Sequence, residues 1–355
     1  MRLVIACGGT GGHFYPGYAL GKALIGRGHE ALFLLRKDDP AGPRLAAEDL
    51  PFTELDLRGL PRGLSLELPG FFLKLWKSYR VSARILEVYR PRAAVGMGGY
   101  LTFPLAAAAR LAGVPVLLHE SNAILGLANR LCLPLARTLA SGLPLSGARL
   151  TGTPIREALW TPAAPAAARA ELGLAPGLPT LLVFGGSQGA RAINLGVPPA
   201  LAKLDVPAQV LHLAGKADAP EVERLYREGG VQAKVLPYLD AMHLAYAAAD
   251  VVLCRSGAAT LAELAACAKP AVLVPYPSSA AGHQELNAAV FADAGAARVA
   301  REPFSAEALA LVLKLLLSDE KTRASMSAAY GRVGLPSPQE SIRLLADLVE
   351  EAARG

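Results

Sequence analysis

The pattern that most constrains the fold occurs twice: a short apolar run is followed at once by a glycine-rich turn. The first run, 3–7, leads into residues 8–13 (Gly-Gly-Thr-Gly-Gly-His), and the second, 181–184, leads into residues 185–190 (Gly-Gly-Ser-Gln-Gly-Ala). The two turns begin half a chain length apart in a chain of 355 residues. A strand that enters a helix through such a turn is typical of nucleotide-binding α/β domains. The sequence therefore predicts two similar domains.

Short runs rich in Leu and Val alternate with Ala- and Leu-rich stretches of helical length throughout the chain, which indicates parallel sheets covered by helices. We predict an α/β protein of two doubly wound, Rossmann-like domains that face each other across a cleft. The expected domains are 1–158 and 159–335, and a C-terminal helix at 336–355 is expected to pack back on the first domain. The predicted strands are 3–7, 31–35, 93–96, 114–118, 180–184, 208–213, 232–236, 250–254 and 270–274, and the predicted helices include 18–27, 101–112 and 123–136.

The composition excludes several classes of protein. The chain is 52% hydrophobic and 19% charged, which excludes a disordered chain. Its four cysteines are far apart and form no C-x-x-C pair, so neither a disulfide framework nor a zinc ribbon is expected and a reducing cytosol is favoured. The longest uncharged stretches are broken by Gly and Pro, which argues against a membrane-spanning helix. The formal net charge of +6 is compatible with anionic partners.

Three glycine-rich turns, at 8–13, 96–100 and 185–190, follow predicted strands and can bring backbone N–H groups close to an anion. A dinucleotide site is disfavoured because Phe14 stands where the third glycine of the fingerprint belongs. The second predicted strand also ends at Arg36 and not at an acidic residue. No Ser or Thr follows Lys22, so a Walker loop is disfavoured as well. The histidines show no metal-ligand spacing, and we expect no metal and no cofactor.

A fourth candidate anion site lies at 255–263, where Ser256 is the expected N-cap of a helix whose first amides face the ligand. Glu263 is either on the solvent face of that helix or turned inward to accept hydrogen bonds from ribose hydroxyls. His13 lies at the expected start of the first helix, where the helix dipole favours the neutral imidazole that a general base requires. The alternative is that His13 is merely a polar loop residue.

Seven motifs, in order over nearly the whole chain, resemble those of glycosyltransferase family 28, in particular its peptidoglycan N-acetylglucosaminyltransferases. The sequence departs from the family at two positions: Ser121 stands where Gln is common, and Gly282 stands where an acidic residue is common. The motifs are Gly8-Gly9-Thr10-Gly11-Gly12-His13, Gly96-Met97-Gly98-Gly99-Tyr100, His119-Glu120-Ser121-Asn122, Gly152-Thr153-Pro154-Ile155-Arg156, Gly185-Gly186-Ser187-Gln188-Gly189-Ala190, Cys254-Arg255-Ser256-Gly257-Ala258 and His283-Gln284-Glu285-Leu286-Asn287-Ala288.

The resemblance implies a GT-B fold and an inverting, metal-independent transfer of N-acetylglucosamine from UDP-N-acetylglucosamine to the muramoyl 4-hydroxyl of lipid I, giving lipid II for peptidoglycan. It implies His13 as the base, Glu263 on the ribose, Leu239 near the uracil and no nucleic-acid partner. The acceptor side would comprise Thr10, Gly11, Gly12, Tyr100 and Asn122. The donor side would comprise Arg156, Ser187, Gln188, Leu239, Ala258, Ala259, Thr260, Leu261, Ala262, Glu263 and Gln284.

A basic and aromatic stretch suggests where such a protein meets a membrane. Between 58 and 92 there are eight basic residues but only Glu67 and Glu87 as acidic residues. We predict that an interfacial patch, peripheral on the cytoplasmic face of the cell membrane, inserts aromatic side chains beside anionic lipid. The alternative is an ordinary amphipathic helix whose aromatic residues belong to the core. The predicted membrane residues are Phe71, Phe72, Leu75 and Trp76, with Lys74, Lys77 and Arg80 beside them.

Two other functions remain open at this point. One is a different GT-B UDP-sugar transferase or a UDP-sugar epimerase, which product analysis would distinguish. The other is a non-catalytic UDP-sugar-binding membrane protein, which would bind the nucleotide without turnover.

Overall fold

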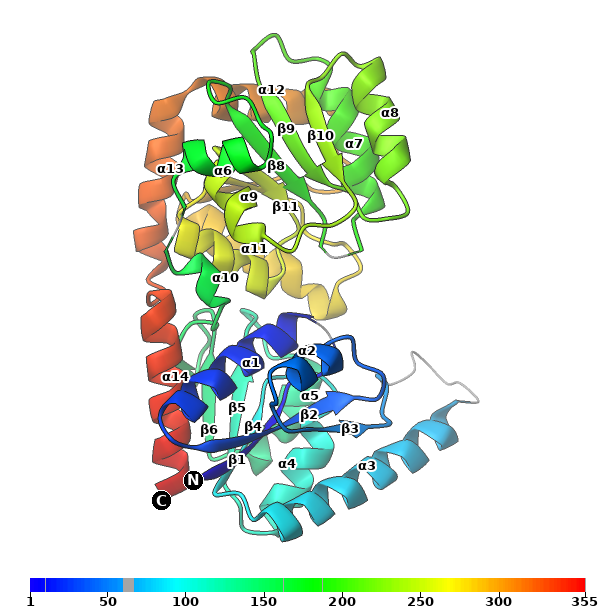
Figure 1. The fold of residues 1–355 in the computed structure, drawn as a ribbon, viewed down its shortest axis with the longest axis vertical. Coiled ribbons are helices and arrows are strands. Elements are labelled where there is room, and N and C mark those ends of the chain that lie inside the picture. The colour runs from blue at the N-terminus through cyan, green and yellow to red at the C-terminus, as the bar shows by residue number, and fades with distance from the viewer. Residues whose placement is uncertain (10, 60–66, 162, 187, 355) are drawn as a thin grey trace. The chain divides into compact units, whose positions relative to one another are not determined.

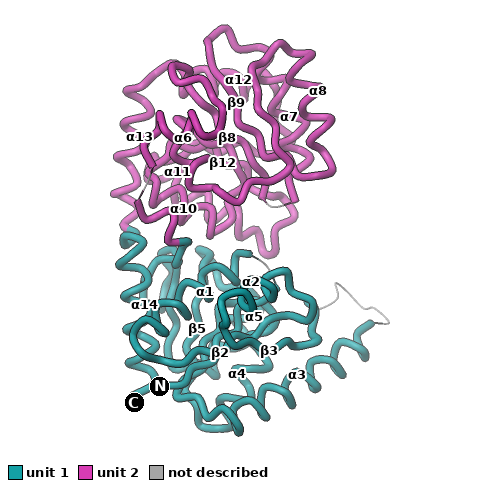
Figure 2. The backbone as a smooth tube through the Cα atoms, in the orientation of Figure 1, with its two compact units in different colours: residues 1–156, 335–355 teal, residues 157–334 magenta. Residues whose placement is uncertain are grey.

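The computed structural model describes residues 1–9, 11–59, 67–161, 163–186 and 188–354 (Figure 1). The chain divides into two compact units (Figure 2). The first consists of Met1–Arg156 together with Leu335–Gly355, and the second is Glu157–Gly334. Among the described residues, no helix is both long and apolar enough to span a bilayer, and no group of three or more His, Cys, Asp or Glu is placed to hold a metal ion. All four cysteines are free.

The first unit is built on a seven-stranded parallel sheet in the order β3-β2-β1-β4-β5-β6-β7. The order reverses at β1, whose Val4 pairs with Leu32 on one side and Ala94 on the other. This topology places the ends of β1 and β4 beside each other, where doubly wound sheets bind ligands. The strands are β1 (Arg2–Ala6), β2 (Glu30–Arg36), β3 (Phe52–Leu55), β4 (Ala93–Gly96), β5 (Val116–Glu120), β6 (Thr138–Ser141) and β7 (Arg149–Leu150).

Helices cover this sheet on both faces because its central strands are apolar on both sides. One buried cluster joins the sheet to α1 and α14, and another joins it to α3 and α4. The helices are α1 (Gly11–Gly26), α2 (Gly42–Ala47), α3 (Leu68–Tyr89), α4 (Thr102–Leu111), α5 (Leu127–Cys132), the 3₁₀ turn η1 (Leu133–Leu135) and α14 (Pro338–Arg354).

The C-terminal helix α14 belongs to the first unit. Its Leu345 and Val349 are fully buried in the cluster that contains α1, and Arg27 at the end of α1 donates to Asp347 at 2.7 Å. At its start, the Ser337 hydroxyl accepts from the Glu340 backbone N–H at 3.2 Å, as the capping-box spacing predicts. The last turns of the chain are therefore packed on the N-terminal sheet.

The second unit repeats the architecture with a six-stranded parallel sheet in the order β10-β9-β8-β11-β12-β13. Its strands are β8 (Thr180–Phe184), β9 (Gln209–Leu213), β10 (Ala233–Leu236), β11 (Val251–Cys254), β12 (Ala271–Leu273) and β13 (Ala297–Val299). Its helices are η2 (Glu157–Leu159), α6 (Pro165–Glu171), α7 (Arg191–Leu201), α8 (Ala219–Glu228), α9 (Met242–Ala248), α10 (Ala258–Cys267), η3 (Ala280–Gly282), α11 (His283–Asp293), α12 (Ala306–Ser318) and α13 (Glu320–Val333).

The predicted class, two doubly wound α/β domains, is confirmed by these sheets. The boundaries of two helices were predicted wrongly. The helix expected at 18–27 begins at Gly11, so the glycine turn is itself the first helical turn. The helix expected at 123–136 is limited to α5 and η1, because residues 121–126 form a loop held by a buried carboxylate. The facing of the two domains across a cleft stays a prediction.

Candidate active site

Three of the predicted acceptor residues, Gly11, Gly12 and Tyr100, lie at the carboxyl edge of the first sheet, on the segments that follow β1 and β4. Gly98 and Gly99 have φ of +89° and +74°, a conformation that favours glycine. A β-carbon on either would lie 3.2 Å from ring atoms of His13. The half-buried imidazole of His13, in the first turn of α1, is therefore packed directly on the turn after β4.

Tyr100 joins the same group of loops. A β-carbon on Gly9 would lie 3.3 Å from the Tyr100 hydroxyl oxygen, so this side chain reaches the turn after β1. Gly11 is exposed and Gly12 is half-buried at the start of α1. Thr10, also predicted here, lies outside the described residues. The structure thus brings Gly11, Gly12, His13 and Tyr100 together at one edge of one sheet.

The loop after β5 is organised by Glu120, a buried carboxylate that is not among the predicted site residues. One carboxylate oxygen accepts from the backbone N–H and the side-chain amide of Asn122, at 3.1 and 2.8 Å. The other accepts from the Gly126 N–H and the Asn129 side chain, both at 2.9 Å. The sequence does carry a signal for this role, because Glu120 ends an apolar strand. A carboxylate that is buried there requires several hydrogen-bond donors. Asn122 is therefore positioned by Glu120.

His119 precedes Glu120 and is fully buried. Its Nε2 lies 3.0 Å from the Gly152 carbonyl, to which it donates, and its Nδ1 lies 3.5 Å from the Ser121 hydroxyl. Burial lowers the pKa of His119, so the imidazole stays neutral. The hydrogen bond from His119 to Gly152 therefore connects β5 to the segment that leads to Arg156. The Arg156 guanidinium carbon lies 5.1 Å from the centre of the Tyr15 ring, which places this predicted donor residue beside α1 in the first unit.

In the second unit, the glycine turn after β8 packs closely on the loop after β9. Gly189 has φ of +77°, and a β-carbon there would lie 2.1 Å from the Ala214 carbonyl oxygen. Glycine is therefore required by the approach of the two backbones as well as by the dihedral angle. Gln188 is exposed on this turn, and Ser187 lies outside the described residues.

The predicted capping role of Ser256 is wrong. The N-cap of α10 is Gly257, and within the described residues no side chain caps this helix. The Ser256 hydroxyl instead donates to the Gln284 carbonyl at 2.8 Å, because Ser256 is fully buried beneath the start of α11. Asn287 donates from its side chain to the Ser256 carbonyl at 3.2 Å. Ser256 thus joins the beginnings of α10 and α11.

The remaining donor candidates lie around this junction. The side chain of Gln284 accepts from the Tyr276 backbone N–H at 3.0 Å. Glu263 is half-buried, and its carboxylate accepts from the Tyr246 hydroxyl at 2.9 Å, so it is not simply on the solvent face. Leu239 is half-buried in the loop after β10. In α10, Ala258 and Leu261 are buried and Ala259, Thr260 and Ala262 are half-buried.

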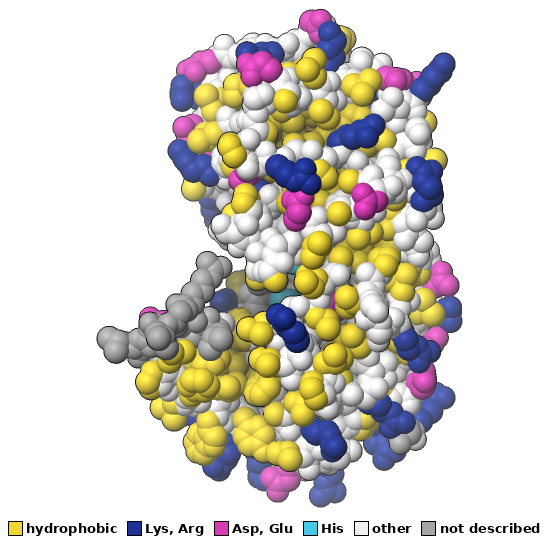
Figure 3. All heavy atoms as spheres, turned by 180° about the vertical axis from the view of Figure 1, so that it is seen from behind, with side chains coloured by type: hydrophobic (Ala, Val, Ile, Leu, Met, Phe, Trp, Pro, Cys, Tyr) yellow, Lys and Arg dark blue, Asp and Glu magenta, His cyan; other side chains and the backbone are white. Residues whose placement is uncertain are grey.

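The four predicted membrane residues lie on α3, and the structure separates them into two pairs. Phe72 and Trp76 have exposed fractions of 59% and 53%, whereas Phe71 and Leu75 pack against the buried cluster under α3. Phe71 and Leu75 are half-buried because α3 covers the sheet with one face, and membrane contact of the four residues stays a prediction. Figure 3 shows hydrophobic side chains gathered over this part of the first unit.

Comparisons with known proteins agree with the motifs. Residues 3–141 match the glycosyltransferase family 28 N-terminal domain, and residues 180–341 match its C-terminal domain. Relatives named UDP-N-acetylglucosamine–N-acetylmuramyl-(pentapeptide) pyrophosphoryl-undecaprenol N-acetylglucosamine transferase include those of Halorhodospira halophila and Elusimicrobium minutum. The first is 40% identical over 99% of this chain and 99% of that protein. The second is 36% identical over 98% of this chain and 99% of that protein.

Solved structures lead to the same family. The crystal structure of Acinetobacter baumannii MurG superposes with a TM-score of 0.81 at 28% identity, covering 99% of each chain. The calicheamicin glycosyltransferase CalG4, at 17% identity and a TM-score of 0.68, shows the shared fold alone. Because both halves match the family's two domains and relatives above 30% identity extend over nearly the whole length, the chain belongs to glycosyltransferase family 28.

Proposed function

We propose that this enzyme transfers N-acetylglucosamine from UDP-N-acetylglucosamine to the muramoyl 4-hydroxyl of lipid I and thereby forms lipid II. The observation that carries the proposal is the end-to-end similarity to relatives whose names describe this transfer. The geometry supports it because the acceptor candidates share one sheet edge in the first unit, while the donor candidates Ala258–Glu263 and Gln284 share the α10–α11 junction of the second.

His13 is the proposed general base. Its imidazole is half-buried and lies on the turn formed by Gly98 and Gly99. The positive end of the α1 dipole favours the neutral ring, which has a lone pair available for the 4-hydroxyl proton. With the hydroxyl attacking the face opposite UDP, the α-linked donor gives a β-linked product. The new bond to the anomeric carbon forms as the bond to the UDP oxygen breaks.

The leaving diphosphate requires positive groups, which we assign to main-chain amides of the second unit. The first turn of α10 has no capping side chain among the described residues, so its N–H groups remain available for an anion. Glu263 is held by Tyr246 and is proposed to accept from the ribose hydroxyls. Preorganised donors of this kind stabilise the charge that develops in the transition state.

The test is the transfer of labelled N-acetylglucosamine from its UDP donor to a lipid I analogue by wild-type, His13→Ala and His29→Gln proteins. We expect His13→Ala to lower kcat by about 100-fold or more, with the affinity for UDP-N-acetylglucosamine retained. His29→Gln, at the other end of the α1 segment, controls for the loss of an imidazole. Turnover retained by His13→Ala removes His13 from the base role. Nucleotide binding without any transfer by the wild type favours a non-catalytic protein.

We also propose that the enzyme binds peripherally to the cytoplasmic face of the membrane through Phe72 and Trp76. The Arg80 guanidinium carbon lies 5.1 Å from the centre of the Trp76 ring, which places a cation beside the exposed aromatic. Aromatic insertion and attraction to anionic lipid then act together. We expect Phe72→Ala with Trp76→Ala to reduce cosedimentation with phosphatidylglycerol vesicles. Leu311→Ala, at an exposed leucine of the second unit, is the control. Unchanged cosedimentation of the double variant contradicts the proposal.

A further inference from the structure

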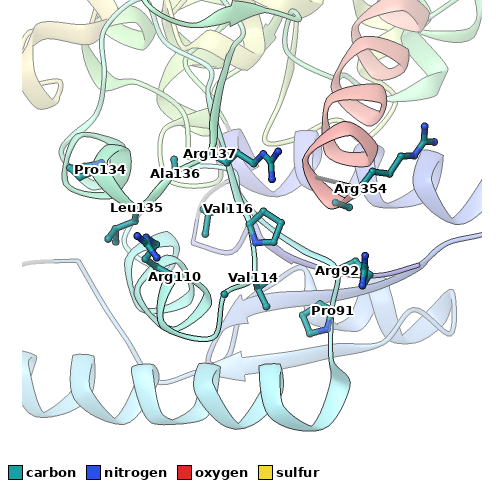
Figure 4. Close-up of a pocket in the computed structure, with 13 residues that line it drawn as sticks. Pro91, Arg92, Arg110, Val114, Val116, Pro134, Leu135, Ala136, Arg137 and Arg354 are labelled. Atoms are coloured by element: carbon teal, nitrogen blue, oxygen red, sulfur yellow. The ribbon is translucent and has the colours of Figure 1, made fainter.

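The first unit has a concavity whose lining contains arginines but no acidic residue. Its volume is about 790 Å³, within the range of small-molecule sites. It is formed by the segments that precede β4, β5 and β6 and by the last residues of α14, as Figure 4 shows. The four arginines are Arg92, Arg110, Arg137 and Arg354.

This pocket is distinct from the candidate acceptor site in the same unit. Arg92 immediately precedes β4 and Arg137 immediately precedes β6, so both lie at the amino edge of the parallel sheet. The loops that carry His13, Tyr100 and Asn122 follow β1, β4 and β5 and lie at the carboxyl edge. The proposed transfer reaction therefore leaves this pocket without a role.

Only two of the four pocket arginines can be explained by a position at the C-terminal end of a helix. Arg110 and Arg354 lie in the last turns of α4 and α14, where a cation interacts favourably with the helix dipole. Arg354 also donates to Glu350 at 3.0 Å. Arg92 and Arg137 precede strands and have no such explanation. Within the described part of the chain, no ion pair is found for Arg92, Arg110 or Arg137.

We propose that Arg92, Arg110 and Arg137 bind a phosphate-bearing anion with at least two negative charges. Arg92, Arg110 and Arg137 are exposed and line the same concavity. Guanidinium groups match phosphate oxygens through paired N–H donors, and three positive charges around one concavity favour a dianion over a single carboxylate. The pocket volume accommodates a diphosphate or a phosphorylated headgroup.

Two sources supply this chemistry. One is a soluble phosphate or diphosphate, and the other is the headgroup of an anionic lipid. Leu111, next to Arg110, is 77% exposed, and Leu133, next to Pro134 in the pocket wall, is 41% exposed. These leucines provide an apolar rim against which lipid chains can lie. The phosphate contacts are the same in both cases.

The experiment titrates the full-length protein with pyrophosphate, in the presence of saturating UDP so that binding at a nucleotide site is suppressed. The variant is Arg92→Gln with Arg137→Gln. The control is Arg227→Gln, an exposed arginine of α8 in the second unit. The same proteins are sedimented with phosphatidylcholine vesicles prepared with and without phosphatidylglycerol. Thermal unfolding checks that both variants are folded.

We expect saturable, salt-sensitive pyrophosphate binding that the double variant weakens by about tenfold or more and that Arg227→Gln leaves unchanged. A loss confined to the phosphatidylglycerol vesicles also supports the site and identifies a lipid headgroup as its source. If the double variant matches the wild type in both assays, the proposal is overturned. Transfer activity is not the readout, so failure of the proposed enzymatic function leaves this test intact.

Discussion

The two units share a doubly wound sheet, but they hold their functional loops in different ways. In the first unit, a single carboxylate, Glu120, orders the loop after β5 through four hydrogen bonds. In the second, the loops after β8 and β9 are in backbone contact through Gly189. A side-chain network can be changed by altering one charge, whereas a backbone contact depends on the absence of a side chain. The contrast predicts which substitutions each unit tolerates.

The largest effect is expected for Gly189→Ala. The added methyl group would lie 2.1 Å from the Ala214 carbonyl oxygen at a φ of +77°, so we expect the second unit to lose about 3 kcal/mol of unfolding free energy. Urea unfolding followed by Trp160 fluorescence in a Trp76→Phe background reports on this unit, because the chain has two tryptophans. Gly186→Ala is the control, since a β-carbon there has open space at a φ of +114°. Equal losses for both variants contradict the backbone-contact explanation.

Glu120→Gln is expected to have the next largest effect, now in the first unit. The NH2 group of the new glutamine would replace one carboxylate oxygen and face other donors such as Gly126 N and Asn129 Nδ2. We expect this to lower the unfolding free energy by about 2 kcal/mol. We expect KM for a lipid I analogue to rise and Kd for UDP to remain unchanged. The matched control is Glu87→Gln, at an exposed carboxylate on α3. A shift in UDP affinity of similar size would show that Glu120 does not act through the acceptor loop.

The buried histidine of the second unit, His212, predicts that the stability of this unit depends on pH. Burial lowers the pKa of His212 to about 3, whereas the unfolded chain titrates near 6.5. The unfolded state therefore binds more protons below about pH 6.5, and stability falls as the pH falls. Between about pH 7 and pH 5, His212 should cost the second unit about 2 kcal/mol. His212→Gln should flatten the pH profile of Trp160 unfolding, and an unchanged slope would exclude this origin.

The smallest effect is expected for Ser256→Ala. Its hydroxyl donates to the Gln284 carbonyl, and loss of that bond costs about 1 kcal/mol and loosens the α10–α11 junction. We expect Kd for UDP-N-acetylglucosamine to rise several-fold in calorimetry. Ser305→Ala removes a hydroxyl that caps α12 and should lower stability without changing this Kd. The same Kd for wild type and Ser256→Ala would separate Ser256 from donor binding.

Several of these features could be read from the sequence. The strand at 93–96 was predicted with the bounds that the structure shows, because its residues are apolar on both faces. The short edge strands β7 and β13 were missed because two or three residues carry no periodicity. Ser256 was assigned to a cap from its position before a helix, but its buried partner comes from α11, 28 residues further along the chain.

The two-domain α/β class and the family follow from the amino-acid sequence alone, because alternating apolar runs, glycine turns and short motifs are local signals. The folded structure was needed to show that His13 packs on the turn after β4 and that Glu120 positions Asn122. It was also needed to show that Phe72 is exposed while Phe71 packs against the cluster under α3. The same holds for Arg92 and Arg137, which are 45 residues apart in the chain and line one pocket. These pairings depend on which strands are neighbours in the sheet, and strand order is fixed by long-range packing.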